Sequence, residues 1–214
     1  MTTVPTRMAP AGPSSREKIL DVAETLFARR SFSGVGMREV ADAVGFGKSS
    51  MFHHFRTKLQ LYGEVLGRVL TRIDDHLQPV LASDVGPLEK LDRWLDSLID
   101  ALAEQPAWSR LLLRALFEDE AFPEADTPER ASAERAMQSI IAGCDALLRD
   151  GIARGVFRRV SVAHTIQTVI GATVYHFASG RFGDELLGRP MLSAEEVSKR
   201  KDAVRTLFHH GIVA

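Results

Sequence analysis

Residues 37–58 read MREVADAVGFGKSSMFHHFRTK, and the organisation of the rest of the chain can be worked out from this stretch. Over residues 37–44 the apolar side chains recur at helical spacing, which predicts a short helix with one apolar side. Gly45-Phe46-Gly47 predicts a sharp turn after it, because glycine tolerates the positive φ that such a turn needs. A second short helix is expected from about Lys48, anchored by the apolar pair Met51 and Phe55.

Two short helices across a turn of this length are typical of a helix-turn-helix, whose second helix fits the major groove of DNA. The outward face of the second helix carries donors and one flat aromatic ring, namely Lys48, Ser49, Ser50, Phe52 and His53. Such groups suit phosphates and base edges. Periodicity alone leaves an ordinary helical hairpin with a basic, solvated face as the alternative.

The surrounding sequence decides between these two interpretations. Residues 16–66 contain an apolar first helix ending in Leu26-Phe27, the segment Arg38-x-Val40-Ala41, Gly45-Phe46, the block Met51-Phe52-x-His54-Phe55, and Lys58 opening a long helix. With these motifs the chain resembles the DNA-binding domain of TetR-type (TetR/AcrR-like) transcriptional regulators. The resemblance covers about 50 of the 214 residues.

The resemblance implies an all-α fold, with a three-helix N-terminal helix-turn-helix domain and a six-helix bundle for ligand binding and dimerisation. It also implies a homodimeric repressor that binds a palindromic operator in double-stranded DNA. A small effector would release this repressor from the operator. The alternative is a constitutive DNA-binding dimer with a filled core and no effector site. An enclosed apolar cavity of roughly 300 Å³ or more would favour the sensing regulator.

The same resemblance places the DNA contacts residue by residue. Arg38 matches a position that reaches a base, and arginine suits guanine. Lys48, Ser49 and His53 match positions that face the groove. Ser50 and Lys58 match positions that bind phosphate.

Two positions depart from the family pattern, and one neighbour is assigned to structure. Phe52 stands where the family usually has a tyrosine, so it can pack on a sugar or a thymine methyl but cannot donate a hydrogen bond. Gly47 stands where a capping serine is common. His54 resembles a histidine that is mainly structural.

Charge is distributed unevenly along the chain, although the net charge is only −1. Residues 1–60 hold nine Lys or Arg against five Asp or Glu, whereas residues 61–214 hold 18 against 23. A basic N-terminal part on an acidic remainder is expected for a protein that touches DNA at one end.

Composition bounds the protein class and compartment. Hydrophobic residues make up 45% of the chain and charged residues 26%, which is typical of a globular protein. The chain has no run of 18 apolar residues and no apolar signal segment, so we expect no membrane association. Cys144 is the only cysteine, which excludes an internal disulfide and fits the reducing cytoplasm.

Three regions are predicted: a disordered tail over residues 1–13, the helix-turn-helix domain over 14–60, and the effector-binding and dimerisation domain over 61–214. A first helix over 15–30 should begin at the capping box of Ser14 and Glu17. A fourth helix should run from Lys58 to about Leu77, where Pro79 stops it, and should carry movement from the second domain to the first. Residues 87–105, 107–118, 129–154, 161–179 and 193–210 should form the other helices, with a loop over 180–192.

Residues 161–179 are unusual because neither face of this helix carries a charge between His164 and Ser179. Such a helix is normally covered on both sides, here by its own bundle and by a second subunit. We assign the dimer interface to its apolar face and to the last helix: Val162, Ile166, Val169, Ile170, Thr173, Phe177, Val204, Leu207 and Phe208.

Large apolar and aromatic side chains on inward stripes are the candidates for an effector pocket. They are Trp94, Leu98, Trp108, Leu112, Phe117, Met137, Ile141 and Tyr175. Their chemistry favours a small apolar or aromatic effector, although each residue taken alone is more often a core residue than part of a ligand wall.

Catalytic and metal sites are weakly indicated. Phosphate-loop, GxSxG and HExxH motifs are missing, so we predict no enzyme and no cofactor. A helical enzyme using His164 and Tyr175 is a remote third possibility. The pairs His53-His54 and His209-His210 are adjacent in sequence and point apart on a helix, so no metal site is expected.

Overall fold

The structure is a computed structural model that describes residues 14–117 and 128–214. Within these residues it contains α-helices and no strand: α1 Ser15–Arg30, α2 Met37–Val44, α3 Lys48–His54, α4 Lys58–Leu81, α5 Pro87–Glu104, α6 Pro106–Phe117, α7 Pro128–Ala153, α8 Val162–Ala178, α9 Arg181–Leu187 and α10 Ala194–Ile212. The predicted all-α fold is therefore confirmed. The predicted tail over residues 1–13 lies outside the described residues.

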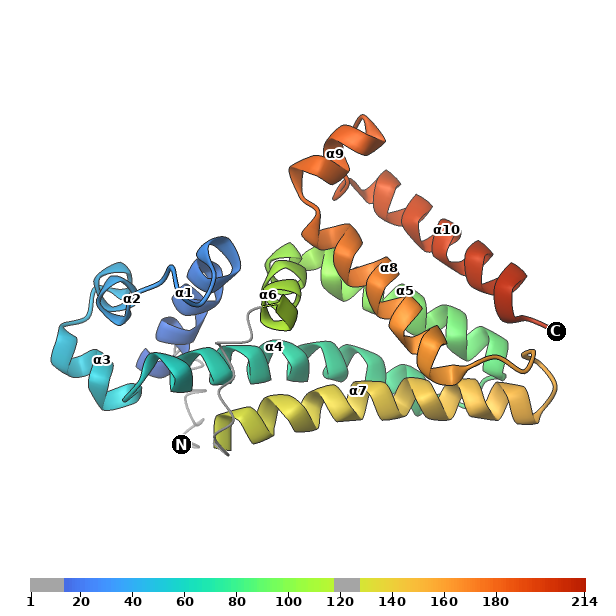
Figure 1. Ribbon diagram of the computed structural model, residues 1–214, viewed down its shortest axis with the longest axis horizontal. Coiled ribbons are helices and arrows are strands. Elements are labelled where there is room, and N and C mark those ends of the chain that lie inside the picture. The colour runs from blue at the N-terminus through green and yellow to red at the C-terminus, as the bar shows by residue number, and fades with distance from the viewer. Residues whose placement is uncertain (1–13, 118–127) are drawn as a thin grey trace, which may run out of the picture.

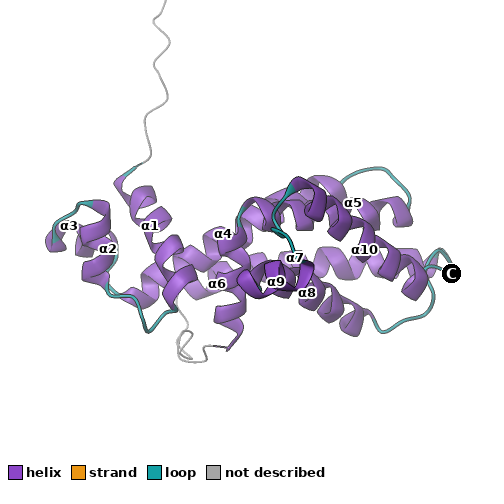
Figure 2. Cartoon of the chain, turned by 90° about the horizontal axis from the view of Figure 1, so that it is seen from above, coloured by secondary structure: helices purple, strands orange, loops and turns teal. Residues whose placement is uncertain are grey.

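Helices α1–α3 form a small unit, called the head below, at one end of an elongated molecule (Figures 1 and 2). Helices α4–α10 form the body. Helix α4 starts beside the head and runs into the body, where α7 packs beside it over most of its length (Figure 1). The two helices are parallel, because Gly67 lies against Ala133 while Gln78 donates a hydrogen bond to Ser139 further along both helices.

The head forms as its sequence predicts. Ser14 and Glu17 make a reciprocal capping box at the start of α1. Gly45 ends α2 with φ +80°, and the amide of Phe46 donates to the carbonyl of Ala41 across the turn. A side chain at position 45 would be strained at this φ, so the turn between α2 and α3 depends on glycine there.

Two helix predictions need correction. Pro79 does not stop α4, which continues to Leu81. A proline in the last turn disturbs only one helical hydrogen bond, and the helix can finish around it. Residues 180–192 are not entirely a loop, because Arg181–Leu187 forms the short helix α9, which ends at Gly188 in the left-handed conformation.

Ion pairs fix the last helix on the body. Asp92, Asp96 and Asp100 lie one turn apart on α5 and pair with His209, Arg205 and Lys201 on α10, at 2.6, 2.8 and 2.6 Å. The order of the pairs makes the two helices antiparallel. None of the helices in the described part of the chain is both long and apolar enough to cross a membrane.

Candidate DNA-binding head, effector cavity and dimer face

The recognition helix is α3, held on the head by apolar packing. Met51 and Phe55 are fully buried, as their four-residue spacing predicts, and they join a core with Phe27, Val40 and Tyr62. Burying one such side chain contributes about 1.5–3 kcal/mol. The orientation of α3 on α1, α2 and the start of α4 is therefore set by the core.

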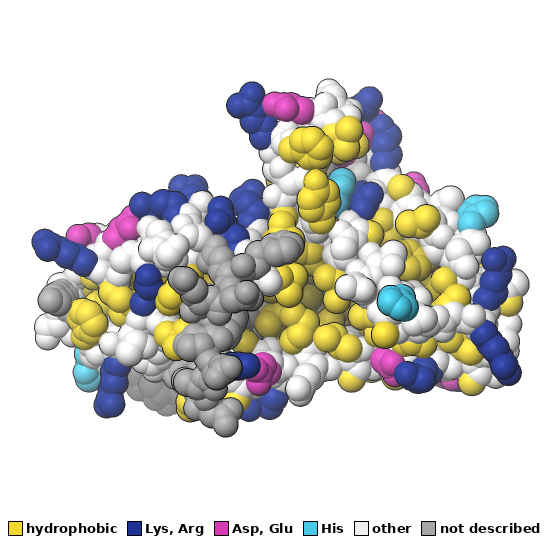
Figure 3. Space-filling view, in the orientation of Figure 1, with side chains coloured by type: hydrophobic (Ala, Val, Ile, Leu, Met, Phe, Trp, Pro, Cys, Tyr) yellow, Lys and Arg dark blue, Asp and Glu magenta, His cyan; other side chains and the backbone are white. Residues whose placement is uncertain are grey.

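The predicted groove-facing residues lie on the outside of this helix. Ser49, Ser50 and His53 are exposed, and Phe52 is 39% exposed, which is high for an aromatic residue. Arg38 extends from α2 into solvent with Asp42 3.9 Å away. Lys and Arg side chains are distributed over this end of the molecule (Figure 3). The side chain of Lys48 lies outside the described residues. The head thus presents side chains suited to binding in the major groove of DNA. Their contacts with DNA remain predictions.

The side chain of Lys58 does not simply extend into solvent, as that of a residue that only binds phosphate would. Its Nζ donates a hydrogen bond to the carbonyl oxygen of Phe32, 3.0 Å away, and lies 4.3 Å from the centre of the Phe32 ring. Lys58 therefore ties the loop between α1 and α2 to the start of α4. An ammonium group has three donor hydrogens, so a phosphate contact remains compatible with this anchor.

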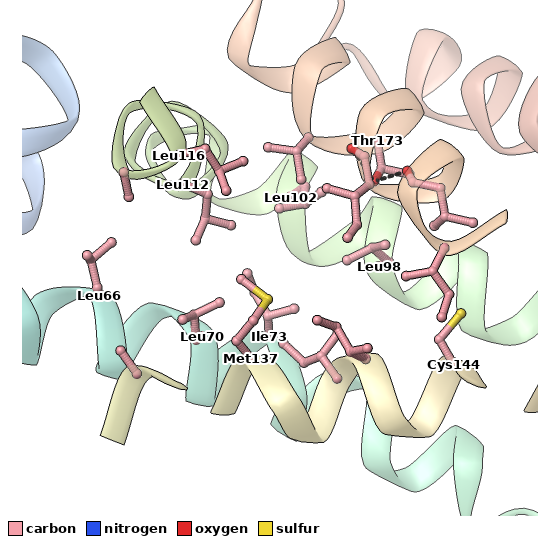
Figure 4. A pocket seen from close by; sticks show the side chains of 18 of the residues that line it. Leu66, Leu70, Ile73, Leu98, Leu102, Leu112, Leu116, Met137, Cys144 and Thr173 are labelled. Carbon is pink, nitrogen blue, oxygen red and sulfur yellow. Dashed lines mark hydrogen bonds between the residues drawn. The ribbon is translucent and has the colours of Figure 1, made fainter. Parts of the chain in front are cut away.

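The body contains an apolar cavity of about 520 Å³. Helices α4, α5, α6, α7 and α8 supply its walls, and Figure 4 shows their side chains converging on it. An apolar hollow is also visible on the surface above α4 and α7 (Figure 3). The volume falls within the range of roughly 300–1,000 Å³ that is usual for small-molecule sites. This volume is above the size set for a sensing regulator, but the cavity opens at the surface, so the expectation of an enclosed cavity is met in size only.

Almost every group on the cavity wall is apolar. Thr173 is fully buried, and its hydroxyl donates to the carbonyl of Val169, 2.8 Å away within the helix. Cys144 is also buried on the wall, and burial raises the pKa of its thiol to about 12. The charged side chains on the wall are Arg130 and Glu134, which pair at 2.6 Å on α7. A ligand would therefore meet hydrocarbon over most of its surface.

Five of the eight predicted effector residues line this cavity: Trp94, Leu98, Leu112, Met137 and Ile141. The prediction is wrong for Tyr175, which is 54% exposed on the other side of α8, and for Trp108, which is buried against the head and absent from the wall. The side chain of Phe117 lies outside the described residues.

Sequence reasoning missed the contribution of α4 to the wall. Leu66, Leu70 and Ile73 line the cavity from this helix. The signal was present, because Leu66 and Leu70 are apolar and lie one turn apart on α4. All three residues are buried, so they belong to the core of the chain as well as to the cavity wall.

The assignment of dimer residues needs a larger correction. Val162, Val169, Thr173, Phe177, Val204 and Phe208 are buried within the single chain, and Ile166 and Ile170 lie half-buried on the cavity wall. Of the nine predicted interface residues, only Leu207 is exposed. The opposite side of α8 is the open one, with His164, Thr168, Gly171 and Tyr175 all exposed. The predicted interface side of α8 is thus the side that packs inward. Both sides of this helix lack charge, so periodicity does not say which one turns inward.

Large hydrophobic residues are exposed on the outer side of α8 and on the helices that follow it. Six of them among the described residues fall on the last three helices and the turn before α10, and we call this set the α8–α10 face: Tyr175, Phe182, Leu186, Leu187, Leu192 and Leu207. Four of the six line a groove of about 500 Å³ between α8, α9 and α10. Apolar side chains are also visible on the projection that α9 forms (Figures 1 and 3). Exposed apolar surface of this kind is typical of interaction sites.

No catalytic arrangement emerges from the histidines. His164 and Tyr175 are exposed on α8, and neither lines the cavity. His209 does pair with a carboxylate, Asp92, but this pair belongs to the ion pairs that fix α10 on α5. Among the described residues, no three His, Cys, Asp or Glu side chains gather in a way that could hold a metal ion.

Comparison with known proteins agrees with this architecture. Residues 19–65 match the family model of bacterial regulatory proteins of the tetR family, and residues 87–207 match a tetracyclin repressor-like C-terminal domain. The chain is 30% identical over 155 residues to the HTH-type transcriptional repressor KstR2 of Mycolicibacterium smegmatis. The aligned region covers 71% of this chain and 73% of that protein.

Solved structures share the fold. The ketosteroid transcriptional regulator KstR2 of Mycobacterium tuberculosis superposes with a TM-score of 0.74 at 22% identity, over 97% of this chain and 100% of that one. AibR, solved in complex with isovaleryl coenzyme A and operator DNA, superposes with a TM-score of 0.73 at 16% identity, over 91% and 97%. The chain belongs to the tetR family of bacterial regulatory proteins and is a DNA-binding transcriptional regulator, not an enzyme.

Proposed function

We propose that this regulator is a repressor that binds a palindromic operator as a homodimer and is released by a largely apolar effector seated in the cavity of the body. The observation that carries the proposal is the cavity of about 520 Å³, built from apolar side chains of five helices that include α4. A constitutive DNA-binding dimer has no use for such a space, and filled cores are more stable than hollow ones.

At the DNA end, α3 would enter the major groove, with Ser49, Ser50 and His53 toward the bases and backbone and Phe52 against a sugar or a thymine methyl. Arg38 would reach a guanine edge from α2 and Lys58 a phosphate from α4. A twofold axis would place two such helices in successive major grooves, about 34–36 Å apart.

The effector is proposed to have a hydrocarbon body, because a wall of leucine, isoleucine, valine and methionine side chains rewards apolar surface and offers few polar partners. Arg130 could meet an acidic end of the ligand at the wall. Two similar proteins point the same way by their descriptions: KstR2 is called a ketosteroid regulator, and AibR was solved with isovaleryl coenzyme A. Acyl and steroid compounds, free or as thioesters, are therefore the class to test first.

The α8–α10 face is proposed as the surface that a second copy of the chain covers. Tyr175 on α8 and Leu207 on α10 would lie in the interface, and α9 would extend it through Phe182 and Leu186. This assignment keeps the pairing of α8 and α10 that was predicted from the sequence, but uses the outer sides of these helices.

Selection of bound fragments from random duplex DNA tests the proposal at the level of the operator. We expect a palindrome whose half-sites lie one helical turn apart, with one dimer bound per site. Titration of the complex with fatty acids, acyl coenzyme A thioesters and steroid acids should then identify compounds that release the DNA. A protein that stays monomeric, or that binds no duplex at low ionic strength, would contradict the proposal, whereas DNA binding that no such compound changes would favour the constitutive dimer.

A further inference from the structure

A buried carboxylate lies where the head meets the body. Glu24 belongs to α1, and only 8% of it is exposed, although the neighbouring core positions on this helix are apolar. One of its oxygens, Oε2, accepts a hydrogen bond from Nη2 of Arg68 on α4 at 2.7 Å. The other, Oε1, accepts from the indole Nε1 of Trp108 on α6 at 2.8 Å. A buried carboxylate without such partners would be strongly destabilising, so the three side chains depend on one another.

The cluster of Glu24, Arg68 and Trp108 is well shielded from solvent. Trp108 is 4% exposed, and the side chain of Arg68 is 16% exposed and also pairs with Asp21 at 2.8 Å. Arg72, one turn further along α4, approaches Glu24 at 3.5 Å. Hydrogen bonds to ionised groups in such surroundings are among the stronger ones, because water does not compete for them.

Both helices that hold Glu24 also build the wall of the cavity. On α6, Trp108 is followed one turn later by Leu112 and two turns later by Leu116, and these two leucines line the cavity (Figure 4). On α4, Leu66 and Leu70 line the cavity, while Arg68 between them points to Glu24. A ligand that pushes on α6 or α4 from within the cavity therefore acts on the helices that hold the head.

We propose that Glu24, Arg68 and Trp108 are positioning residues that set the orientation of the head on the body, and that the indole of Trp108 transmits displacement of α6 to α1. This inference rests on the proposed ligand-controlled DNA binding and adds the residues through which control is exerted. The cluster is a discrete contact that is either made or broken, which is the kind of element through which two sites can be coupled.

Two substitutions that each remove one hydrogen bond between helices provide the test. Trp108→Phe keeps an aromatic ring and removes only the indole N–H that Glu24 accepts. Ser97→Ala is the control: it removes another hydrogen bond between helices, the one that the hydroxyl of Ser97 on α5 donates to the carbonyl of His76 on α4 at 2.8 Å, and Ser97 does not line the cavity. Operator affinity and amide hydrogen exchange are measured for both variants and for the wild type, on the full chain.

For Trp108→Phe we expect faster exchange in α1 and the first turns of α6, unchanged exchange in α7, and about tenfold weaker operator binding, which is the scale of one hydrogen bond to a charged group. For Ser97→Ala we expect head exchange and operator affinity to stay within about twofold of the wild type. Glu24→Ala should weaken operator binding as well, and adding Trp108→Phe to it should cost little more, because the oxygen that accepts the indole N–H is already absent.

The inference is overturned if Trp108→Phe matches Ser97→Ala in head exchange and operator affinity, or if the effects of Trp108→Phe and Glu24→Ala simply add. A wild-type protein that binds no operator would instead refute the proposed function. Hydrogen exchange in α1 would still report the positioning role in that case, so the two failures can be told apart.

Discussion

The ammonium group of Lys58 caps the carbonyl of Phe32 at 3.0 Å and lies 4.3 Å from the centre of the Phe32 ring. Phe32 in turn packs edge-on against Tyr62, one turn into α4. The residue that resemblance assigns to a DNA phosphate is thus also the anchor of the loop that connects α1 and α2.

Replacing Lys58 with alanine should therefore have two separable effects. Loss of the carbonyl hydrogen bond and of the cation–π contact should lower the free energy of unfolding by about 1–2 kcal/mol. Loss of a phosphate contact should weaken binding to all DNA sequences alike and reduce the salt dependence of log Kd by about one. Arg56→Ala, at an exposed position one residue before the N-cap of α4, is the control for a change in charge alone. If only the stability of Lys58→Ala falls and its salt dependence matches the wild type, the phosphate contact is wrong and the anchor stands.

Two charged substitutions distinguish the inner and outer sides of the last helices. Leu207→Glu adds a charge to the α8–α10 face, where the side chain is 59% exposed, and should split the dimer while the chain stays folded. Val169→Glu places a charge on the buried side of α8 and should destabilise the chain by roughly 3 kcal/mol or more. Sedimentation and thermal unfolding measure these effects. A dimer that survives Leu207→Glu would move the interface away from this face.

Filling the cavity should weaken binding of a dye that binds apolar sites. Ile170→Trp directs a larger ring from α8 into the cavity, whereas Tyr175→Trp makes an aromatic change on the exposed side of the same helix. With anilinonaphthalene sulfonate as the probe, we expect at least tenfold weaker binding to Ile170→Trp and little change for Tyr175→Trp. The crowding should lower the free energy of unfolding by about 1–3 kcal/mol. Equal dye binding by both variants would place the apolar site outside the cavity.

His176 should make stability depend on pH. Burial, and secondarily the charge of Arg200, lower the pKa of His176 to about 4. In the unfolded chain a histidine binds its proton near pH 6.5. Between these values the unfolded state binds more protons than the folded state, so the free energy of unfolding should fall as the pH drops from about 6.5 to about 4, and change no further on this account below that.

Replacing His176 with asparagine removes this group, so urea unfolding at pH 7 and pH 5 should show a smaller loss than in the wild type. His164→Asn, at an exposed position of the same helix, is the matched control. Arg200, Glu196 and Lys199 line the groove beside His176 and are unchanged in both variants. An equal pH dependence in the wild type and His176→Asn would show that the imidazole is accessible to protons in the folded state.

The thiol of Cys144 should be inert in the folded protein. Burial raises its pKa to about 12, so the reactive thiolate is scarce at neutral pH. We expect alkylation by iodoacetamide at pH 8 to be at least a hundredfold slower in the native protein than in urea, measured by mass spectrometry. Rapid native labelling would indicate that the cavity admits water and polar reagents freely.

Local sequence determined the parts of this protein that depend on neighbouring residues. The capping box at Ser14, the turn at Gly45 and the apolar spacing of Met51 and Phe55 specify the head, because caps, backbone φ and helical periodicity act within a few residues. The helical character of the body followed from the same periodicity. The resemblance of residues 16–66 then placed the head in a family.

Tertiary structure alone decided which apolar surface became core, cavity or open face. Helix α8 is uncharged on both sides, so nothing in its periodicity distinguishes the side of Val169, which packs inward, from the side of Tyr175, which lies open. Trp108 looked like a pocket residue and instead holds Glu24, 84 positions away in the sequence. Periodicity defines the faces of a helix, but what each face contacts is settled only when distant helices pack together.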